Sequence, residues 1–450
     1  MRIKRGHLLL FLAMGGCAQA PVADRAPAID LRDPTPRPDL AIEWNRRVLS
    51  IAESEDRFLT LKGVRAAAMM HLAMHDALNA VDARYATYLP APEATGANPT
   101  VAAAQAAYEI VVSQYPDQST ALTAELDRWI GAMPRDPAWL RGVALGKERA
   151  AAILARRTDD GWDGEAEYTW HPMGPGVYAE FAEHSGTPEG FVFGAGWSAA
   201  RPFALESGDQ FRSPPPPSVD SEAYTAAFRE VKEVGRFESR TRTEDQSHLA
   251  MWWKDFVENS HNRLARDLAV RENLDLWRAT RLFAMLNLSV YDAYVSVFDN
   301  KFFYNHWRPY TAIRWAENDG NPATEADPSW DNLHRHTYAF PSYPSAHGCA
   351  SAAAMTALAD TFGEATAFTM RTDRVDRAGP LSDKIEMDPA TRSFESFQAA
   401  ALECAMSRVY LGIHFRYDSV EGNALGSRIG RHAVEKVLVP IGSDRAESPR

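Results

Sequence analysis

Apolar residues recur every three or four positions through most of the first third of the chain. This spacing places apolar side chains on one face of a helix, so each such stretch is predicted to be helical. The stretches are 67–81, 102–115, 119–133 and 137–156. Asp136 and Pro137 support the start of the last one, because aspartate caps helices and proline fits a first helical turn.

The pattern changes at residues 158–222, where Gly, Pro, Trp, Phe and Tyr dominate and four prolines follow one another at 214–217. This composition predicts long ordered loops, which often build substrate channels. Helical periodicity returns at 221–298, and a second irregular stretch covers 318–344. The last helices are predicted at 346–362, 391–413 and 417–437.

The order of these elements indicates the fold class. No alternation of strands and helices and no series of strands is evident, so we expect an all-α fold with long aromatic and Pro-rich loops. Two four-helix bundles facing each other are the expected architecture. We expect an N-terminal helical half with the long loop region at 41–222, and a C-terminal helical half at 223–440.

The N-terminus has the pattern of an export signal. Three basic residues precede a short apolar run and then small residues, which predicts a signal peptide at 1–20 and a Pro-, Ala- and Asp-rich tether at 21–40. Cleavage before Cys17 would leave a lipid anchor, whereas cleavage after Ala20 would release the chain. Periplasmic, outer-membrane-anchored and secreted locations are the options. The later sequence contains no apolar run of about 18 residues, so no transmembrane span is expected.

Net charge and cysteine content limit which partners and which covalent cross-links are expected. The 450-residue chain carries a formal net charge of −12, which argues against a polyanion such as nucleic acid as a partner. Cys349 and Cys404 remain after processing. They form either one disulfide or two buried thiols, and the sequence leaves both options open.

Polar groups that suit a tetrahedral oxyanion are concentrated in three short segments of the last third. Lysine and arginine bind such oxygens, and histidine serves as metal ligand or proton carrier. The segments are Lys301 to Arg308-Pro309, then Pro344-Ser345-Ala346-His347, then Ser407-Arg408 to His414 and Asp418. In an acidic chain, these cations predict a pocket for one small anion.

The second and third segments each have a local geometry that fits this chemistry. A helix that begins at Ser345 directs its hydroxyl and free backbone N–H groups toward a bound anion. His347 then lies in the first turn, where it can exchange protons with the anion. His414 and Asp418 are four residues apart, so on a helix the carboxylate can orient the imidazole.

The order and spacing of the three segments resemble the signature of the vanadium-dependent haloperoxidase and type 2 phosphatidic acid phosphatase superfamily. That signature is Lys, six residues and Arg-Pro, then Pro-Ser-Gly-His, then Ser-Arg, five residues, His, three residues and Asp. Ala346 stands where the family usually has glycine. The stretches 284–308 and 75–81 also look like the soluble bacterial haloperoxidase branch.

The resemblance implies an activity, a cofactor and a role for each residue. The activity would be the oxidation of halide by hydrogen peroxide to hypohalous acid at a bound vanadate, with a small organic substrate as a further reactant. His414 would be the metal ligand, His347 the acid–base group and Asp418 the group that orients His414. The groups that would hold the vanadate oxygens are Lys301, Arg308, Ser345, the backbone N–H near Ala346, and Arg408. Lys301 would also be a catalytic residue.

Two other functions remain open for the same residues. Because vanadate mimics phosphate, phosphate can occupy the site, and an exported acid phosphatase would use His414 as nucleophile and His347 as acid. A non-catalytic exported anion-binding protein would need neither histidine. Chain size, the exported soluble chain and the aromatic loops favour the haloperoxidase, and a homo-oligomer is left open.

His71 and His75 are a second candidate pair of histidines. Their spacing of four on a predicted helix can bind a metal, but two further ligands would be needed. We expect them to serve in packing, together with a hydrogen bond from Asp76.

Overall fold

The computed structural model describes residues 37–442. The predicted signal peptide, Cys17 and most of the predicted tether lie outside the described residues and stay predictions. Helices dominate the described part of the chain, which confirms the all-α prediction. Among the described residues, no helix is both long enough and apolar enough to cross a bilayer.

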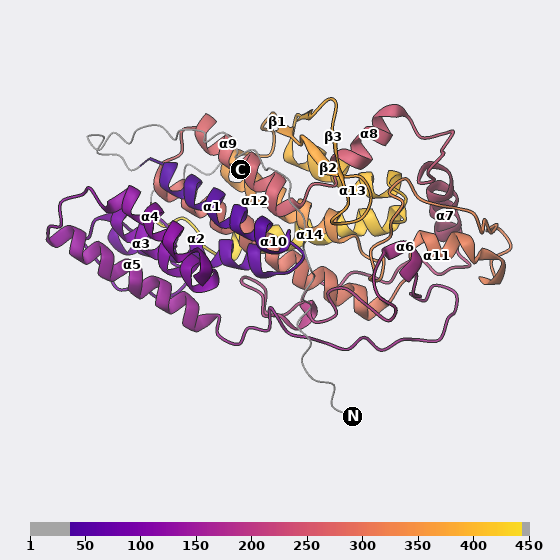
Figure 1. Ribbon diagram of the computed structural model, residues 1–450, viewed down its shortest axis with the longest axis horizontal. Coiled ribbons are helices and arrows are strands. Elements are labelled where there is room, and N and C mark those ends of the chain that lie inside the picture. Colours follow the sequence, from indigo (N-terminus) through magenta and orange to yellow (C-terminus); the bar gives the residue numbers. More distant parts are fainter. Residues whose placement is uncertain (1–36, 443–450) are drawn as a thin grey trace, which may run out of the picture. The chain divides into compact units, whose positions relative to one another are not determined.

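Five helices form the first group. They are α1 (Asp39–Asp56), α2 (Lys62–Val81), α3 (Pro99–Gln114), α4 (Ser119–Ile130) and α5 (Pro137–Arg156) (Figure 1, indigo to magenta). Helix α2 is buried along almost its whole length, because it packs against α1, α3, α5 and α10. The Asp136 carboxylate accepts the Trp139 N–H at 2.8 Å, which confirms the predicted cap of α5.

A second group carries the three polar segments. It consists of α10 (Leu276–Tyr304), α12 (Ala346–Phe362), α13 (Phe397–Tyr410) and α14 (Arg416–Lys436). Helix α12 packs against the other three, and α10 also contacts α2, so α10 links the two groups. The boundary near residue 222 that the sequence suggests between the two halves stays a prediction.

Glycines bring α12 and α14 unusually close together. A Cβ atom on Gly422 would lie 2.4 Å from the carbonyl oxygen of Ser345, and one on Gly426 would lie 2.0 Å from that of Cys349. Both distances are below van der Waals contact, so a larger residue would force the helices apart. This close approach lets the Ser345 N–H donate to the Asp418 carbonyl oxygen at 2.9 Å.

Shorter elements and loops connect the two groups. The helices are α6 (Ala182–Ser185), α7 (Glu222–Val234), α8 (Glu244–Trp252), α9 (Val257–Arg271) and α11 (Pro309–Arg314). Residues 158–221 are mostly irregular, as the sequence predicts. Their apolar side chains nevertheless reach the core, where Phe203 and Leu205 are buried.

Two small antiparallel pairs of strands were not predicted. They are β1 (Phe368–Arg371) with β4 (Thr391–Phe394), and β2 (Arg374–Asp376) with β3 (Lys384–Glu386). The predicted helix 391–413 is therefore wrong at its start. The side chain of Ser396 accepts the Ala399 N–H and caps α13, which begins only at Phe397.

The two described cysteines are free and buried. Burial raises the pKa of the Cys404 thiol to about 12, so it stays protonated at neutral pH. The buried-thiol alternative is therefore the correct one.

Candidate active site

The three polar segments meet where α10 ends, α11 and α12 begin and α13 turns into α14. Each predicted residue lies at a helix end or in a tight turn, where side chains and free backbone groups can converge. Lys301 is in the last turn of α10, Arg308 caps α11, Ser345 caps α12, Arg408 is in the last turn of α13, His414 lies between α13 and α14, and Asp418 is in the first turn of α14. These six side chains are at most 4% exposed.

His414 is held on both sides of its ring. Nδ1 lies 3.0 Å from Asp418 Oδ2, and Nε2 lies 3.1 Å from Arg308 Nη1. Because a guanidinium can only donate, Nε2 is the acceptor and Nδ1 carries the proton shared with Asp418. Burial, with Arg308 and Lys301 adding to it, lowers the pKa of His414 well below its usual value. The ring is therefore neutral, with a lone pair on Nε2.

Ser342 joins this pair, although it belongs to none of the predicted motifs. Its hydroxyl donates to Asp418 Oδ2 and lies 3.3 Å from His414 Nδ1. Asp418 Oδ2 also accepts the N–H of Phe415 at 3.1 Å. Burial raises the pKa of Asp418 to about 6, while the Ser342 hydrogen bond and the charge of Lys301 act in the opposite direction.

Lys301 and Arg308 are fixed by backbone carbonyl groups. Lys301 Nζ donates to the carbonyl oxygens of Pro341 at 3.0 Å and Ser342 at 2.7 Å. Arg308 donates from Nε to Phe340 O and from Nη1 to Ile413 O, both at 2.9 Å. Ser342 thus contacts the lysine through its carbonyl oxygen and the aspartate through its hydroxyl. Burial, with the charge of Arg308 adding to it, lowers the pKa of Lys301.

The carbonyl oxygen of Trp253 positions two further groups. It accepts from Arg408 Nη1 at 3.2 Å and from the ring of His347. His347 is half-buried in the first turn of α12, and its Nε2 has no partner among the described residues. Burial and the nearby Arg408 charge lower the pKa of His347 well below its usual value. The neutral ring can therefore carry a proton to or from the pocket.

The start of α12 adds backbone and hydroxyl donors. Ser345 Oγ accepts the Gly348 N–H at 3.3 Å as the helix cap, so its own hydroxyl proton remains free to donate. Ala346 is the first helical residue and lines the same cavity as His347. Helix N-termini attract anions through such unpaired N–H groups and through the helix dipole.

Two buried donors of this cluster have no partner in the described chain. They are Arg308 Nη2 and Arg408 Nε, and the acceptor nitrogen Nε2 of His347 is unpaired as well. Unpaired buried donors cost free energy, and three buried cations in this cluster stand against the single Asp418 carboxylate. An oxyanion with several oxygens satisfies both demands, so vanadate or phosphate fits the residues present.

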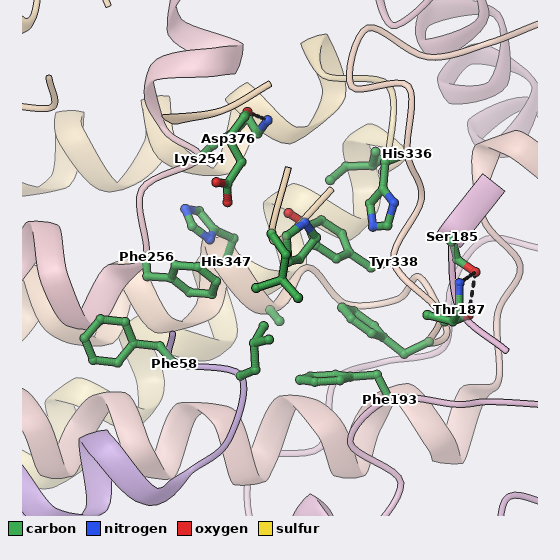
Figure 2. A pocket seen from close by; sticks show the side chains of 18 of the residues that line it. Phe58, Ser185, Thr187, Phe193, Lys254, Phe256, His336, Tyr338, His347 and Asp376 are labelled. Atoms are coloured by element: carbon green, nitrogen blue, oxygen red, sulfur yellow. Dashed lines mark hydrogen bonds between the residues drawn. The ribbon is translucent and has the colours of Figure 1, made fainter. Parts of the chain in front are cut away.

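A cavity of about 470 Å³ opens above this cluster. Ala346, His347, Arg408 and His414 form its floor, and aromatic side chains including Phe193, Phe256 and Tyr338 line its walls (Figure 2). Lys301, Arg308 and Asp418 lie behind this floor, through their contacts with His414 and the 340–342 backbone. An oxyanion bound by this cluster would therefore lie between the cations and the open cavity.

All the residues singled out in the three motifs are thus brought to one place. The sequence missed Ser342 and the Trp253 carbonyl oxygen. Ser342 lies only three residues before Ser345, but short spacing alone cannot indicate which hydroxyl faces Asp418. Backbone carbonyl groups leave no signal in a sequence at all.

The chain resembles known proteins in sequence and in fold. Residues 281–442 match the profile of the family described as the VCPO second helical-bundle domain. No curated protein sequence matches the chain significantly.

Solved structures extend the similarity to most of the chain. The first bacterial vanadium-dependent iodoperoxidase has a TM-score of 0.71 and 25% sequence identity, over 89% of this chain and 97% of that one. The holo-type bacterial vanadium-dependent chloroperoxidase has a TM-score of 0.62 and 17% identity, over 84% and 91%. Its apo-type gives the same score and identity, over 83% and 92%, and these two likenesses concern the fold.

The predicted resemblance is therefore confirmed: residues 281–442 match the VCPO second helical-bundle domain, and the chain is similar in fold to bacterial vanadium-dependent haloperoxidases.

Proposed function

We propose that this protein is a vanadate-dependent haloperoxidase that oxidises halide with hydrogen peroxide. The observation that carries the proposal is the buried cluster of Lys301, Arg308 and Arg408 beside an open cavity. In this cluster, Arg308 Nη2 and Arg408 Nε have no partner among the described residues. The similarity to the vanadium-dependent iodoperoxidase supports the choice of cofactor.

The residues that would hold vanadate are those of the three segments. The His414 Nε2 lone pair accepts from Arg308 Nη1 in this structure and would bind the metal in exchange for that hydrogen bond, while Asp418 keeps the proton on Nδ1. Oxygen atoms would be bound by Lys301, Arg308, Arg408, Ser345 and the N–H of Ala346. When bound, vanadate supplies a Lewis acid that stays oxidised and activates hydrogen peroxide.

The protein's own groups control protons and water around this centre. His347 lines the cavity and its Nε2 has no partner among the described residues, so it can take a proton from incoming peroxide and return it to the departing oxygen. The aromatic walls limit the number of water molecules near the site, which strengthens the hold of the cations on a bound anion. In the net reaction, halide, hydrogen peroxide and one proton give hypohalous acid and water.

The first test is bromination of a phenolic dye by the vanadate-free chain, before and after orthovanadate is added. We expect bromination that needs vanadate, peroxide and bromide together. A phosphomonoester assay runs alongside. Release of phosphate that vanadate inhibits, with no bromination, would reassign the same residues to an exported acid phosphatase. Anion binding without either activity would indicate a binding protein.

We also propose that the chain is exported and that its N-terminus is processed near Cys17 or Ala20. The basic, apolar and small-residue order of the first 20 residues supports this location. Mass spectrometry of the processed N-terminus after cell fractionation distinguishes a lipidated Cys17 from a free N-terminus after Ala20. An uncleaved chain in the cytoplasm would contradict the proposal.

A further inference from the structure

The cavity above His347 is much larger than halide oxidation requires. It measures about 470 Å³, whereas a water molecule takes about 30 Å³ in the liquid. Peroxide and halide are small reactants of a comparable scale, so they alone would leave most of the cavity to water. Cavities of several hundred cubic ångströms with apolar walls are typical of sites for organic ligands.

Aromatic rings form one continuous wall of this cavity. The Phe340 ring lies 5.8 Å from that of Phe193 and 5.7 Å from that of Tyr338, with an interplanar angle of 23° to the latter. Phe193 in turn contacts Trp197 at 5.0 Å. Such a wall favours a flat apolar ring, which can stack on it or meet it edge to face.

Two polar groups interrupt the apolar lining on another wall. Lys254 Nζ donates to the carbonyl oxygens of Asp376 and of Ala378, the latter at 2.9 Å. Burial, with the charge of Arg408 adding to it, lowers the pKa of Lys254 to about 7, and in the protonated form one of its three donors remains for a ligand. Asp376 Oδ1 is buried and has no partner among the described residues. Figure 2 shows the Asp376 carboxylate directed into the pocket on the same side as His347. A ligand hydroxyl could donate to Asp376 and accept from Lys254.

The charges of the wall restrict the class of ligand. The Asp376 carboxylate disfavours an anionic group placed beside it, while Arg408 on the floor disfavours an organic cation. A neutral ring compound with a hydroxyl group avoids both and satisfies the unpaired carboxylate oxygen.

We propose that this pocket binds a hydroxyl-bearing aromatic compound of the phenol or naphthol class, with its ring against Phe193, Tyr338 and Phe340 and its hydroxyl on Asp376. The inference rests on the proposed function, because hypohalous acid formed at the floor then halogenates the bound ring. A ring carbon forms a bond to the halogen, the O–halogen bond breaks, and the hydroxide that leaves combines with the displaced ring proton as water. The hydrogen bond to Asp376 makes the ring more electron-rich and so more reactive toward the electrophile.

Binding is tested first, on the full chain without vanadate. Isothermal titration calorimetry compares 2-naphthol with its methyl ether, which has the same ring but no hydroxyl proton. We expect saturable binding of 2-naphthol and roughly tenfold weaker binding of the ether, because a charged acceptor loses its donor. Equal affinities, or no binding of either compound, would overturn the inference.

The Asp376→Ala variant should bind 2-naphthol no better than the wild-type chain binds the ether. The matched control is Asp373→Ala, because Asp373 precedes the same strand but is exposed and pairs with Arg371. Circular dichroism checks that both variants fold. The Asp376→Asn variant keeps an acceptor oxygen at this position. Its affinity for 2-naphthol should therefore lie between those of the wild-type chain and Asp376→Ala. An unchanged affinity in Asp376→Ala contradicts the assignment of this residue.

A kinetic measurement separates this inference from the proposed function. With vanadate, bromide and peroxide, the rate of 2-naphthol bromination should saturate, and Asp376→Ala should raise its KM roughly tenfold. Bromide-dependent consumption of peroxide without any organic compound reports hypobromous acid formation alone. If that consumption is absent, the proposed function is wrong. If it is present and bromination rises linearly with 2-naphthol in both chains, only the pocket inference is wrong.

Discussion

Two pairs of buried histidines in this molecule look alike in isolation and differ in their surroundings. His71 and His75 on α2 are fully buried, and burial lowers the pKa of each to about 3. Burial also lowers the pKa of His347 and His414. Each of His71, His75 and His347 has one ring nitrogen without a partner in the described chain. Burial, a shifted pKa and an unpaired nitrogen therefore do not identify a catalytic histidine.

The neighbours of each pair make the difference. His71 accepts from Asn45 at 3.3 Å and stacks on Phe283 with ring centres 5.0 Å apart, and His75 lies 3.1 Å from the carbonyl oxygen of Ala86. Both are buried in the core and neither lines the cavity, so their predicted role in packing is confirmed. The predicted hydrogen bond with Asp76 is wrong, because the Asp76 carboxylate accepts the N–H groups of Tyr88 and Leu89 instead. His347 and His414 line the cavity, with Arg308, Lys301 and Arg408 around His414 and Arg408 near His347. A histidine of this molecule is therefore suited to catalysis when it borders the cavity and lies near buried cations. His71 and His75 have neither property.

The comparison is tested most severely by His414→Ala. Loss of the lone pair should remove vanadate binding and reduce vanadate-dependent bromination by about a thousandfold or more, as expected when a group central to the reaction is removed. Titration calorimetry with vanadate and the dye assay measure the two effects. His432→Ala, which removes a histidine that contacts Phe211 outside the cavity, should leave both unchanged. Full activity in His414→Ala would refute the proposed function of the site.

Asp418→Asn should have the next largest effect. Removing the charge weakens the hydrogen bond that fixes Nδ1–H of His414, and partners of this kind typically change metal affinity by about 10- to 100-fold. We expect the vanadate Kd of the folded variant to rise by this factor, and the melting temperature to fall as well, because the three buried cations lose their only carboxylate. An unchanged Kd would show that Arg308 alone holds the ring.

Ser342→Ala should weaken vanadate binding less, by roughly tenfold, because Asp418 keeps its contacts with His414 and the Phe415 N–H. The variant removes only the Ser342 hydroxyl. Alanine keeps the backbone carbonyl oxygen that binds Lys301, so the effect of the hydroxyl is measured alone. Ser407→Ala is the matched control, since that buried hydroxyl donates to the Cys404 carbonyl oxygen within its own helix. Equal effects of the two variants would indicate general packing rather than positioning.

The fold and the site differ in how far the sequence could predict them. The helices were predictable because each buries one apolar face, as 137–156 does behind the Asp136 cap. The 391–394 error arose because a short strand gains its stability from a distant partner, here 368–371, and leaves little local pattern. The motif residues could be predicted because they occur in three short segments with a recognisable order and spacing. Asp376 and Ser342 were missed because their importance comes from what long-range folding places beside them.

The smallest effect on activity is expected from His71→Gln. This variant should change how the free energy of unfolding depends on pH, which distinguishes His71 from the histidines of the cavity. Below the usual pKa of 6.5 the unfolded chain binds a proton at this position, while the folded chain does not until about pH 3. Because the unfolded state binds more protons in that window, the free energy of unfolding falls as pH falls from 6.5 toward 3, by up to about 1.4 kcal/mol per pH unit. Glutamine, which cannot titrate, should remove this contribution and flatten the curve measured by urea unfolding. Bromination per folded molecule at pH 7 should equal that of the wild-type chain, and a large loss there would place His71 in the catalytic group after all.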